Sequence, residues 1–463
     1  MKAKYVSFDR RLLENFSWPL ALSALGLAVC GLVNLYSISL SHPPESGLSE
    51  FGKQLLFCGG GVALCLAALC VDYRILKRVA LPLFGIGVGL LLMVEFFGVV
   101  AGGARRWLDI ASFRFQPSEF MKPALVILLA ALFSAKEFAK KGLTLATFPL
   151  PAVLTLVPVG LVLKEPDLGT AGLLGFTALP IFLYAAWSRA LKLAVAALAA
   201  AALSWIFLFG GLDFLLAKEI IHPYQLERVL THSNPEEDYN GKGWQIIQSK
   251  RAIGSGQILG RGFHDGTQQK YGFLPAPNTD FAFAALAEEW GFVGCCAVIA
   301  LYYTLLCSAL GVVRRCRDLF GKYLALGLSS LIFCQMAINI AMVTGLFPVV
   351  GIPLPFVSYG GTSLLVSLLA AAGILNIGMR RYLFQDATVI ENRKAWEEGQ
   401  AIALKERIPA VRRLTPPAEG EPDVFPDYRR PHVKPWLKYV GRRSAVRPYL
   451  RDSPPPDPRQ PLQ

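Results

Sequence analysis

Charged residues are scarce in this chain of 463 residues. Asp, Glu, Lys and Arg make up 17% of the sequence against 54% for hydrophobic types, and the mean hydropathy is +0.44. Soluble domains contain roughly 25% charged residues, and a soluble protein of this size could not bury so much apolar surface in one core. The composition excludes collagen, a disulfide scaffold and a wholly disordered chain, and it predicts a protein that crosses a membrane several times.

Disulfide, zinc and nucleotide motifs are also missing. The nine cysteines all fall in or beside apolar runs, and no CxxC pair or Cys/His spacing occurs, so we expect neither a disulfide framework nor a zinc site. Residues 254–266 contain five glycines but no Gly-Lys-Ser/Thr sequence, which argues against nucleotide binding. No convincing cleavage site follows the basic N-terminus, and we expect an uncleaved first span.

Apolar runs predict an all-α polytopic membrane protein with about ten transmembrane helices. A span needs roughly 20 predominantly apolar residues. The runs cover residues 18–40, 54–71, 79–100, 117–135, 146–163, 168–187, 190–209, 290–313, 323–345 and 359–379. One long polar loop, at about 210–289, separates the seventh span from the eighth.

Lys and Arg in the short loops predict the orientation, because cytoplasmic loops retain these residues. With residues 1–17 in the cytoplasm, every inner loop is basic and the loop at 210–289 lies outside. The basic residues of the inner loops are Arg74, Lys77, Arg78, Lys136, Lys140, Lys141, Arg189, Lys192, Arg314, Arg315, Arg317, Lys322, Arg380 and Arg381. Arg105, Arg106 and Arg114 fall on the outer side; they either bind an anionic group or form an ordinary surface cluster, unless the topology itself is wrong there.

The chain after the last span has a different composition. Residues 382–463 are 82 residues with 13 prolines, and they contain 15 Lys and Arg against 11 Asp and Glu. Proline at that density blocks regular structure, so we predict a disordered cytoplasmic tail after a transmembrane domain at 18–381. Its basic residues either contact anionic lipid or a partner, or remain solvated. Although the net charge is +13, the sequence contains no nucleic-acid-binding motif.

Ionisable residues at the edges of spans are costly to bury, so they are the first candidates for a functional site. Glu119 and Lys122 follow Pro117 at the start of a span and share one helix face, where they either neutralise each other or present a lysine to a phosphate. The turn at 164–170 needs only its proline and glycine, yet it also contains Glu165 and Asp167.

Two further clusters lie in the long loop and before the last span. The loop has polar segments at 234–245, 248–256, 266–268 and 278–281, and it closes with Glu288 and Glu289. Residues 345–362 contain three prolines and several glycines, which cannot form a continuous helix. Irregular backbone at membrane depth survives only when it is buried in protein or lines a cavity. The pattern therefore predicts an outer cavity, which fits either a membrane enzyme or a transporter.

Four motifs resemble the SEDS family of shape, elongation, division and sporulation proteins. They are Arg-Phe-Gln-Pro-Ser-Glu at 114–119, Glu-Pro-Asp-Leu-Gly-Thr at 165–170, Gln-Ser-Lys at 248–250 and Pro-Leu-Pro-Phe-Val-Ser-Tyr-Gly-Gly at 353–361. The resemblance runs from about residue 18 to 381. Within the family, residues 252–256 and 345–353 are more like the elongation branch than the division branch.

The resemblance implies a peptidoglycan glycosyltransferase that polymerises lipid II into glycan strands on the outer face of the cytoplasmic (inner) membrane. It also implies a class B penicillin-binding protein as the cross-linking partner, with other membrane proteins of the elongation complex. The family's essential loop aspartate carries over to Asp238. Two motifs depart from the family pattern: Tyr239 stands where Pro is usual, and Ala-Pro-Asn precedes Thr279 and Asp280 where Glu and His are usual.

A polymerase outside the cytoplasm must use a donor activated as a lipid pyrophosphate. Arg and Lys suit the phosphates, and Asp238 is the candidate for deprotonating the acceptor hydroxyl, although it could instead hold a divalent cation such as Mg or Mn. Direct attack would invert the anomeric carbon. The candidate substrate-binding residues are Arg106, Arg114, Glu119, Lys122, Glu165, Asp167, Gln248, Ser249, Lys250, Arg251, Thr267, Gln268, Thr279, Asp280, Ser358 and Tyr359.

Three other functions remain open at this point. A lipid II flippase would use the buried charges to line a translocation path. A noncatalytic scaffold would recruit the penicillin-binding protein and would not need Asp238. A polymerase specific for division would belong to the other branch of the family. The sequence shows no inverted repeat of broken spans, which transporter folds often contain.

Overall fold

The computed structural model describes residues 14–41, 48–101, 104–110, 113–136, 138, 142–186, 190–197 and 242–380. These residues belong to one compact unit, Met1–Glu391. Asp238, the whole of the long loop before residue 242, and the predicted tail at 382–463 lie outside the described residues.

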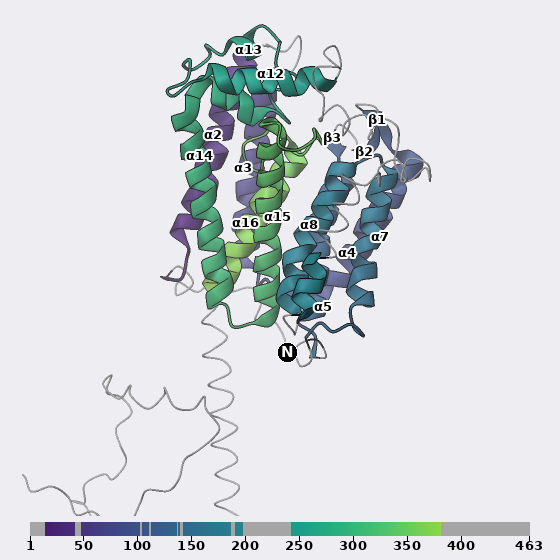
Figure 1. Cartoon of the computed structure of the whole chain (residues 1–463). Helices are drawn as coiled ribbons and strands as arrows, with labels where there is room; N and C mark the ends of the chain where they lie inside the picture. The colour runs from purple at the N-terminus through teal and green to yellow at the C-terminus, as the bar shows by residue number, and fades with distance from the viewer. Residues whose placement is uncertain are drawn as a thin grey trace, which may run out of the picture. The chain divides into compact units, whose positions relative to one another are not determined.

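Long helices dominate the described residues, as the apolar runs predict (Figure 1). Seven of them are long and apolar enough to cross a membrane. These are α2 (Trp18–Ser41), α3 (Glu50–Cys70), α4 (Ile75–Phe97), α8 (Leu168–Ala185), α14 (Ala282–Arg315), α15 (Leu319–Val343) and α16 (Gly361–Arg380). Two shorter helices, α5 (Pro117–Phe133) and α7 (Pro149–Lys164), occupy two more predicted spans. Of the predicted span 190–209, residues 190–197 are helical and the rest lies outside the described ranges, so the count of ten remains a prediction.

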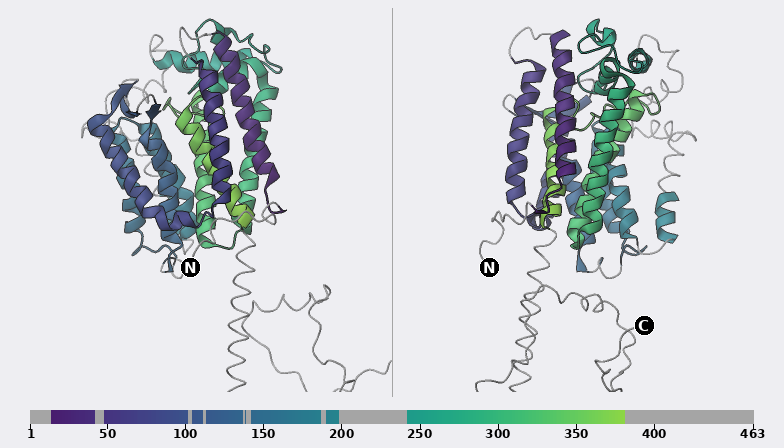
Figure 2. Two further views of the ribbon diagram at one scale, coloured as in Figure 1. Left: turned by 180° about the vertical axis from the view of Figure 1, so that it is seen from behind. Right: turned by 90° about the vertical axis from the view of Figure 1, so that its left-hand side faces the viewer.

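The helices pack in two groups that α15 joins. Helix α2 packs on α3 and α14, and α16 packs on α3, while α4 packs on α5 and α7 packs on α8. Helix α15 contacts α14 and α16 on one side and α5 and α8 on the other. Figure 2 shows that α2 and α14, which are far apart in sequence, lie side by side.

One end of the helices contains the described parts of all four polar clusters that the sequence singles out. Two short helices, α12 (Lys242–Ser255) and α13 (Thr267–Lys270), lie at this end. The turns before α8 and α16 also lie here, because the chain runs up α7 and α15 and down α8 and α16 (Figure 1). Following the sequence-based orientation, we call it the outer end; the opposite end contains the basic turns around Arg74 and Arg314.

A small β-sheet at the outer end was not predicted. Strands β1 (Val99–Ala101), β2 (Ala104–Ile110) and β3 (Phe113–Phe115) pair antiparallel in that order. Strands β1 and β3 have three residues each, too few for an alternating pattern, and the seven residues of β2 do not alternate strictly. They pair because only two residues separate each strand from the next in the sequence, and Leu108 of β2 is buried. The fold is therefore helical as predicted, with this sheet as an addition.

Helix α14 begins earlier than predicted and breaks at Gly291, whose φ is 64° and ψ is −165°. The segment after α12 fills the break. The amides of Arg261 and Gly262 donate to the carbonyls of Glu288 and Glu289 at 3.0 and 3.1 Å. In return, the amides of Phe292 and Val293 donate to the carbonyls of residues 257 and 258 at 2.9 and 3.1 Å. These four hydrogen bonds replace pairs that the break removes from the helix, as burial requires.

Buried polar side chains hold the irregular segments on either side of the outer cavity. Asn34 of α2 donates to the Ala282 carbonyl at 3.1 Å. Asn339 of α15 donates to the carbonyls of Asp280 and Ile352 at 2.9 and 2.7 Å. These amides bind buried backbone carbonyls and so tie the start of α14 to α2 and residues 280 and 352 to α15.

Candidate functional site

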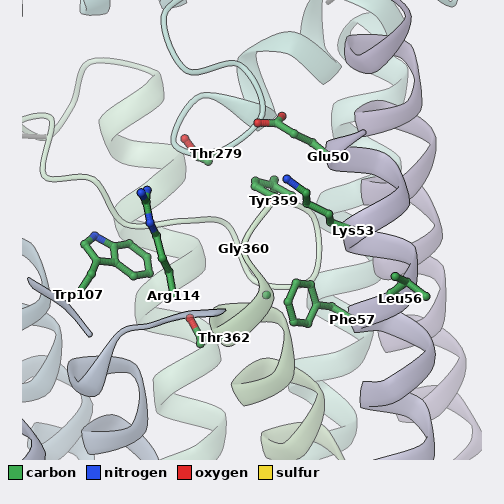
Figure 3. A pocket seen from close by; sticks show the side chains of 11 residues that line it. Glu50, Lys53, Leu56, Phe57, Trp107, Arg114, Thr279, Tyr359, Gly360 and Thr362 are labelled. Atoms are coloured by element: carbon green, nitrogen blue, oxygen red, sulfur yellow. The ribbon is translucent and has the colours of Figure 1, made fainter. Parts of the chain in front are cut away.

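A pocket opens at the outer end of the helices, as the Pro/Gly segment predicts. Its volume is about 920 Å³. Three parts of the chain form most of its walls: the start of α3, the segment before α16 with the first residues of that helix, and the strands β2 and β3 (Figure 3). Thr279, from the loop before α14, adds to them. The lining residues are Glu50, Lys53, Leu56, Phe57, Trp107, Arg114, Thr279, Tyr359, Gly360, Gly361 and Thr362.

The α3 wall is polar at its outer end and apolar below. Ser49 caps the helix by accepting from the Gly52 amide at 3.1 Å, so Glu50 and Lys53 fall in its first turn. Glu50, Lys53 and Phe57 are spaced by three and four residues, so they share one helix face. Figure 3 shows Lys53 beside Tyr359, with Phe57 deeper along α3.

The strand wall faces the α3 wall across the pocket. Trp107 lies on β2 and Arg114 on β3, where the sheet register pairs Arg114 with Asp109. The Nε of Arg114 lies 3.5 Å from Asp109 Oδ1, and 66% of the arginine side chain is exposed. Such an exposed pair is weak, so the guanidinium is free to exchange Asp109 for an anionic ligand. The α3 wall thus contributes the cation Lys53 and the ring of Phe57. The strand wall contributes the cation Arg114 and the ring of Trp107.

The third wall is the segment before α16. Ser358 Oγ donates to the Thr279 carbonyl at 2.6 Å and accepts from the Leu354 amide at 2.9 Å. The Tyr359 amide donates to the Asn278 carbonyl at 2.7 Å, and the Asn278 side chain donates to Glu50 Oε2. Hydrogen bonds therefore link residues 278–279, the Tyr359 segment and α3 around the pocket.

The pocket is electrostatically mixed. Lys53 and Arg114 supply two positive charges and Glu50 one negative charge. Tyr359, which precedes α16, has a raised pKa because burial disfavours the phenolate and the Glu50 carboxylate adds repulsion. Its hydroxyl therefore stays protonated at neutral pH and can donate a hydrogen bond to a ligand.

Arg106 does not line the pocket; it holds the turn between α7 and α8. Its Nε donates to the Glu165 carbonyl at 3.3 Å, its Nη2 donates to the Pro166 carbonyl, and its Nη1 lies 3.7 Å from Asp167 Oδ2. Asp167 also caps α8 by accepting from the Thr170 amide and hydroxyl at 3.0 and 2.9 Å. The guanidinium thus fastens the sheet to the turn.

Glu165 lies in that turn, outside the spans, and is 5% exposed. Neither carboxyl oxygen has a hydrogen-bond partner. Burial raises the pKa of Glu165 to about 8, the nearby Asp167 charge adds to the increase, and Arg106 partly offsets it. A carboxyl of this kind can hold a proton at neutral pH.

Glu119 and Lys122 pair within α5, as their spacing predicts. Lys122 Nζ lies 2.6 Å from Glu119 Oε1, and their side chains are 1% and 4% exposed. Glu119 Oε2 has no hydrogen-bond partner. Neither residue is among those that line the pocket, so presentation of Lys122 to a phosphate remains a prediction.

The predicted residues of the long loop occupy several environments. Gln248 and Ser249 of α12 are buried, and Ser249 Oγ donates to the Val343 carbonyl at 2.7 Å. Lys250 lies over Gly345, where an added Cβ would overlap its side chain, and Arg251 is exposed.

Thr267 and Gln268 bind the buried Glu288 instead of the pocket. The Thr267 hydroxyl and the Gln268 amide donate to Glu288 Oε1 at 3.1 and 3.0 Å. Of the other candidates, Thr279 and Tyr359 line the pocket, Asp280 accepts from Asn339 through its carbonyl, and Ser358 supports the third wall.

The structure cannot place Asp238, which lies outside the described residues. Within the ranges that it does describe, no three or more His, Cys, Asp or Glu side chains come together as metal ligands. The predicted roles of Asp238 as a base or as a cation ligand therefore stay predictions.

Sequence reasoning did not assign Glu50, Lys53 and Trp107 to the site. Glu50 and Lys53 stand three residues apart just before an apolar run, which is a signal for charges at the outer end of a span. Trp107 stands between Arg106 and Arg114, two residues that were assigned to the site. What the sequence could not show is that the two segments face each other.

Known proteins match the same part of the chain that contains the four motifs. A family model for FtsW, RodA and SpoVE, described as "Cell cycle protein", matches residues 18–382. The chain is 41% identical to the peptidoglycan glycosyltransferase MrdB of Escherichia coli over 322 residues, which are 68% of this chain and 83% of that protein. It is 35% identical to a probable peptidoglycan glycosyltransferase FtsW of Trichlorobacter lovleyi over 374 residues, 79% of this chain and 93% of that protein.

A solved structure is also similar. It is described as "Structural coordination of polymerization and crosslinking by a peptidoglycan synthase complex", and one of its chains matches with a TM-score of 0.65 and 30% identity. The match covers 79% of this chain and 98% of that chain.

Proposed function

Since this chain belongs to the FtsW/RodA/SpoVE family, the SEDS family, we propose that it is a peptidoglycan glycosyltransferase that polymerises lipid II. The similar proteins named as peptidoglycan glycosyltransferases support the activity. The observation that carries the substrate class is the outer pocket, where cations stand above an apolar wall. Such a pocket suits a molecule with an anionic head and a hydrophobic tail.

The polar part of the pocket suits a sugar pyrophosphate. Lys53 offers a point charge and Arg114 a planar fork that can bind phosphate oxygens in pairs. Trp107 and Tyr359 offer aromatic faces and a hydroxyl donor for the sugar. The apolar side chains of Leu56 and Phe57 continue toward the membrane along α3, where the isoprenoid tail would lie.

The reaction that we propose is direct transfer. The acceptor sugar hydroxyl attacks the anomeric carbon of the donor, the bond from that carbon to the pyrophosphate breaks, and the lipid pyrophosphate leaves. Asp238 takes the proton of the acceptor hydroxyl, a contribution typically worth about 10² to 10⁴ in rate. Lys53 and Arg114 stabilise the negative charge that develops on the leaving group. One displacement inverts the anomeric configuration.

The location and partner follow from the same proposal. The basic turns at the end opposite the pocket support a cytoplasmic position for that end. The pocket then opens at the outer face of the bacterial cytoplasmic membrane, with both termini in the cytoplasm. The similarity to a synthase complex that coordinates polymerisation and crosslinking supports a class B penicillin-binding protein as partner. Motifs at 252–256 and 345–353 favour a RodA-like role in elongation.

Polymerisation assays on pocket variants test this proposal. The full chain with its penicillin-binding partner, free of any class A enzyme, is given lipid II, and glycan strands are measured. Lys53→Ala and Arg114→Ala should each raise the KM for lipid II several-fold. Lys77→Ala, at the opposite end, where Lys77 donates to the Ser134 carbonyl at 3.3 Å, is the matched loss of one cation. Equal kinetics in all three variants and wild type would exclude this pocket as the substrate site.

A further inference from the structure

Gln54 of α3 connects two walls of the pocket without lining it. Its side chain is 2% exposed. Its Nε2 donates to the Ser358 carbonyl at 3.1 Å, and its Oε1 accepts from the Gly360 amide at 3.2 Å. One side chain therefore binds the backbone on both sides of Tyr359, more than 300 residues away in the sequence.

The residues around Gln54 on α3 face the pocket. Glu50 stands one turn before it, Lys53 is the preceding residue, and Phe57 follows three residues later. Phe57 also packs so closely on Gly361 that a Cβ there would overlap its ring. Together, Gln54 and Phe57 set how near the Tyr359 segment lies to α3.

A second link closes this arrangement into a ring. Glu50 accepts from the Asn278 side chain, and the Asn278 carbonyl accepts from the Tyr359 amide. Gln54, which is also on α3, accepts from the Gly360 amide. Tyr359 is thus held on both sides by groups anchored on α3. The separation of Tyr359 from Lys53 is therefore a built feature of the fold.

We infer that Gln54 is a positioning residue: it holds Tyr359 and Gly360 opposite Lys53 so that one ligand can contact both walls. This inference rests on the proposed function for the identity of that ligand, lipid II. Gln54 touches no ligand itself, so its loss should weaken substrate binding more than it slows the chemical step.

An amide suits this position because it combines a donor NH2 group and an acceptor oxygen in one plane. Methionine matches its length but can pair with neither the Ser358 carbonyl nor the Gly360 amide. An ionised glutamate can accept from the Gly360 amide, but it also places a negative oxygen against the Ser358 carbonyl. A protonated glutamate regains the donor and reproduces both hydrogen bonds.

Kinetics of two variants test the inference in the complete complex. Gln54→Met should raise the KM for lipid II about fivefold and change kcat less than about twofold. Gln54→Glu should show a larger increase in KM at pH 8 than at pH 6, relative to wild type at the same pH, because protonation restores the donor. The ionisable groups of the adjoining pocket are Glu50 and Lys53 on α3, Tyr359 before α16 and Arg114 on β3. All are present in the wild-type reference.

The matched control is Gln335→Met. Gln335 is a buried amide of α15, 1% exposed, and it is not among the residues that line the pocket. Its loss should leave the KM for lipid II unchanged even if it lowers thermal stability. An equal KM for wild type and Gln54→Met, or no pH-dependent recovery in Gln54→Glu, would overturn the inference.

Hydrogen exchange separates this inference from the proposed function. The Gly360 amide should exchange at least about tenfold faster in Gln54→Met than in wild type, because it loses its acceptor. If wild type makes no glycan, the proposed function fails, and the exchange result alone decides whether Gln54 holds the segment. Unchanged protection of Gly360 would show that it does not.

Discussion

Arg106 on β2 holds the turn between α7 and α8, with its Nη1 3.7 Å from Asp167 Oδ2 and two further nitrogens on the carbonyls of Glu165 and Pro166. The arginine is 17% exposed and Asp167 is 5% exposed. This contact joins one of the outer arginines to the motif at 165–170, both of which the sequence singled out. It gives Arg106 a structural contact at the outer end, where the sequence predicted that this arginine binds substrate.

Replacing Arg106 should destabilise the protein. Arg106→Ala removes the three contacts and should lower the free energy of unfolding by about 2 kcal/mol. Arg106→Lys should recover only part of this, because an ammonium cannot reach three acceptors in one plane. Thermal unfolding in detergent measures the effect. Arg105→Ala is the control, since Arg105 is exposed and donates to one carbonyl, that of Glu95; an equal loss in both variants would contradict this account.

Removing only Lys122 from the Glu119–Lys122 pair should destabilise the protein more than replacing both residues. Lys122→Met leaves a buried carboxylate and should destabilise the protein by about 3 to 5 kcal/mol. The double variant Glu119→Gln with Lys122→Met should recover much of that loss. Unfolding measurements on single and double variants test this expectation, and a double variant as unstable as the single one would refute it.

Activity tests the predicted role of Lys122 separately from stability. Lys122→Ala should reduce glycan synthesis more than Lys242→Ala, whose residue begins α12. If the double variant that regains stability also regains synthesis, the pair is structural. Small, equal losses in both alanine variants would argue against a buried pyrophosphate site at Lys122.

Glu165 should make stability depend on pH. Its pKa in the folded protein is about 8, against an ordinary value of 4.5. The folded state therefore holds the proton over a range in which the unfolded state has lost it, so the contribution of Glu165 is fully present below about pH 4.5 and is lost as the pH rises through about 8. The melting temperature of the wild type should therefore fall over this range more than that of Glu165→Gln. Parallel pH profiles of the two proteins would contradict the raised pKa.

Gly260 should tolerate no side chain. Its φ is +82°, and a Cβ there would overlap the backbone of Glu289 at the break in α14. Gly260→Ala should therefore lower stability and loosen the segment that fills the break. Gly254→Ala is the matched control, because it lies in α12 with nothing within 4 Å of an added Cβ, and alanine favours a helix by about 0.5 to 1 kcal/mol. Similar melting temperatures for the two variants would rule out the close approach.

The positions of the helices could be predicted because apolar length is a local property. The predicted span 18–40 is α2, at Trp18–Ser41, and the predicted span 168–187 is α8, at Leu168–Ala185. The Gly291 break could not be predicted, since it depends on backbone pairing with residues 257–262. The sheet was missed because β1 and β3 have only three residues each and β2 does not alternate strictly between apolar and polar residues.

The site was only partly predictable for the same reason. Arg114, Thr279 and Tyr359 were predicted from their motifs and line the pocket. Glu50 and Lys53 were left out because their part in the pocket depends on contact with the Tyr359 segment. That contact runs through Gln54, which is about 300 residues from its partners, and no spacing in the sequence could reveal it.

Glycan synthesis from purified lipid II tests the central claim most directly. The full chain with its penicillin-binding partner, in a preparation without any class A enzyme, is compared with the same complex bearing Asp238→Asn. The account predicts glycan strands from wild type and none from a folded Asp238→Asn complex. Equal synthesis by both would move the base elsewhere, with Glu237 and Asp280 as the next candidates. No synthesis by a folded wild-type complex would contradict the glycosyltransferase and favour a lipid II flippase or a scaffold.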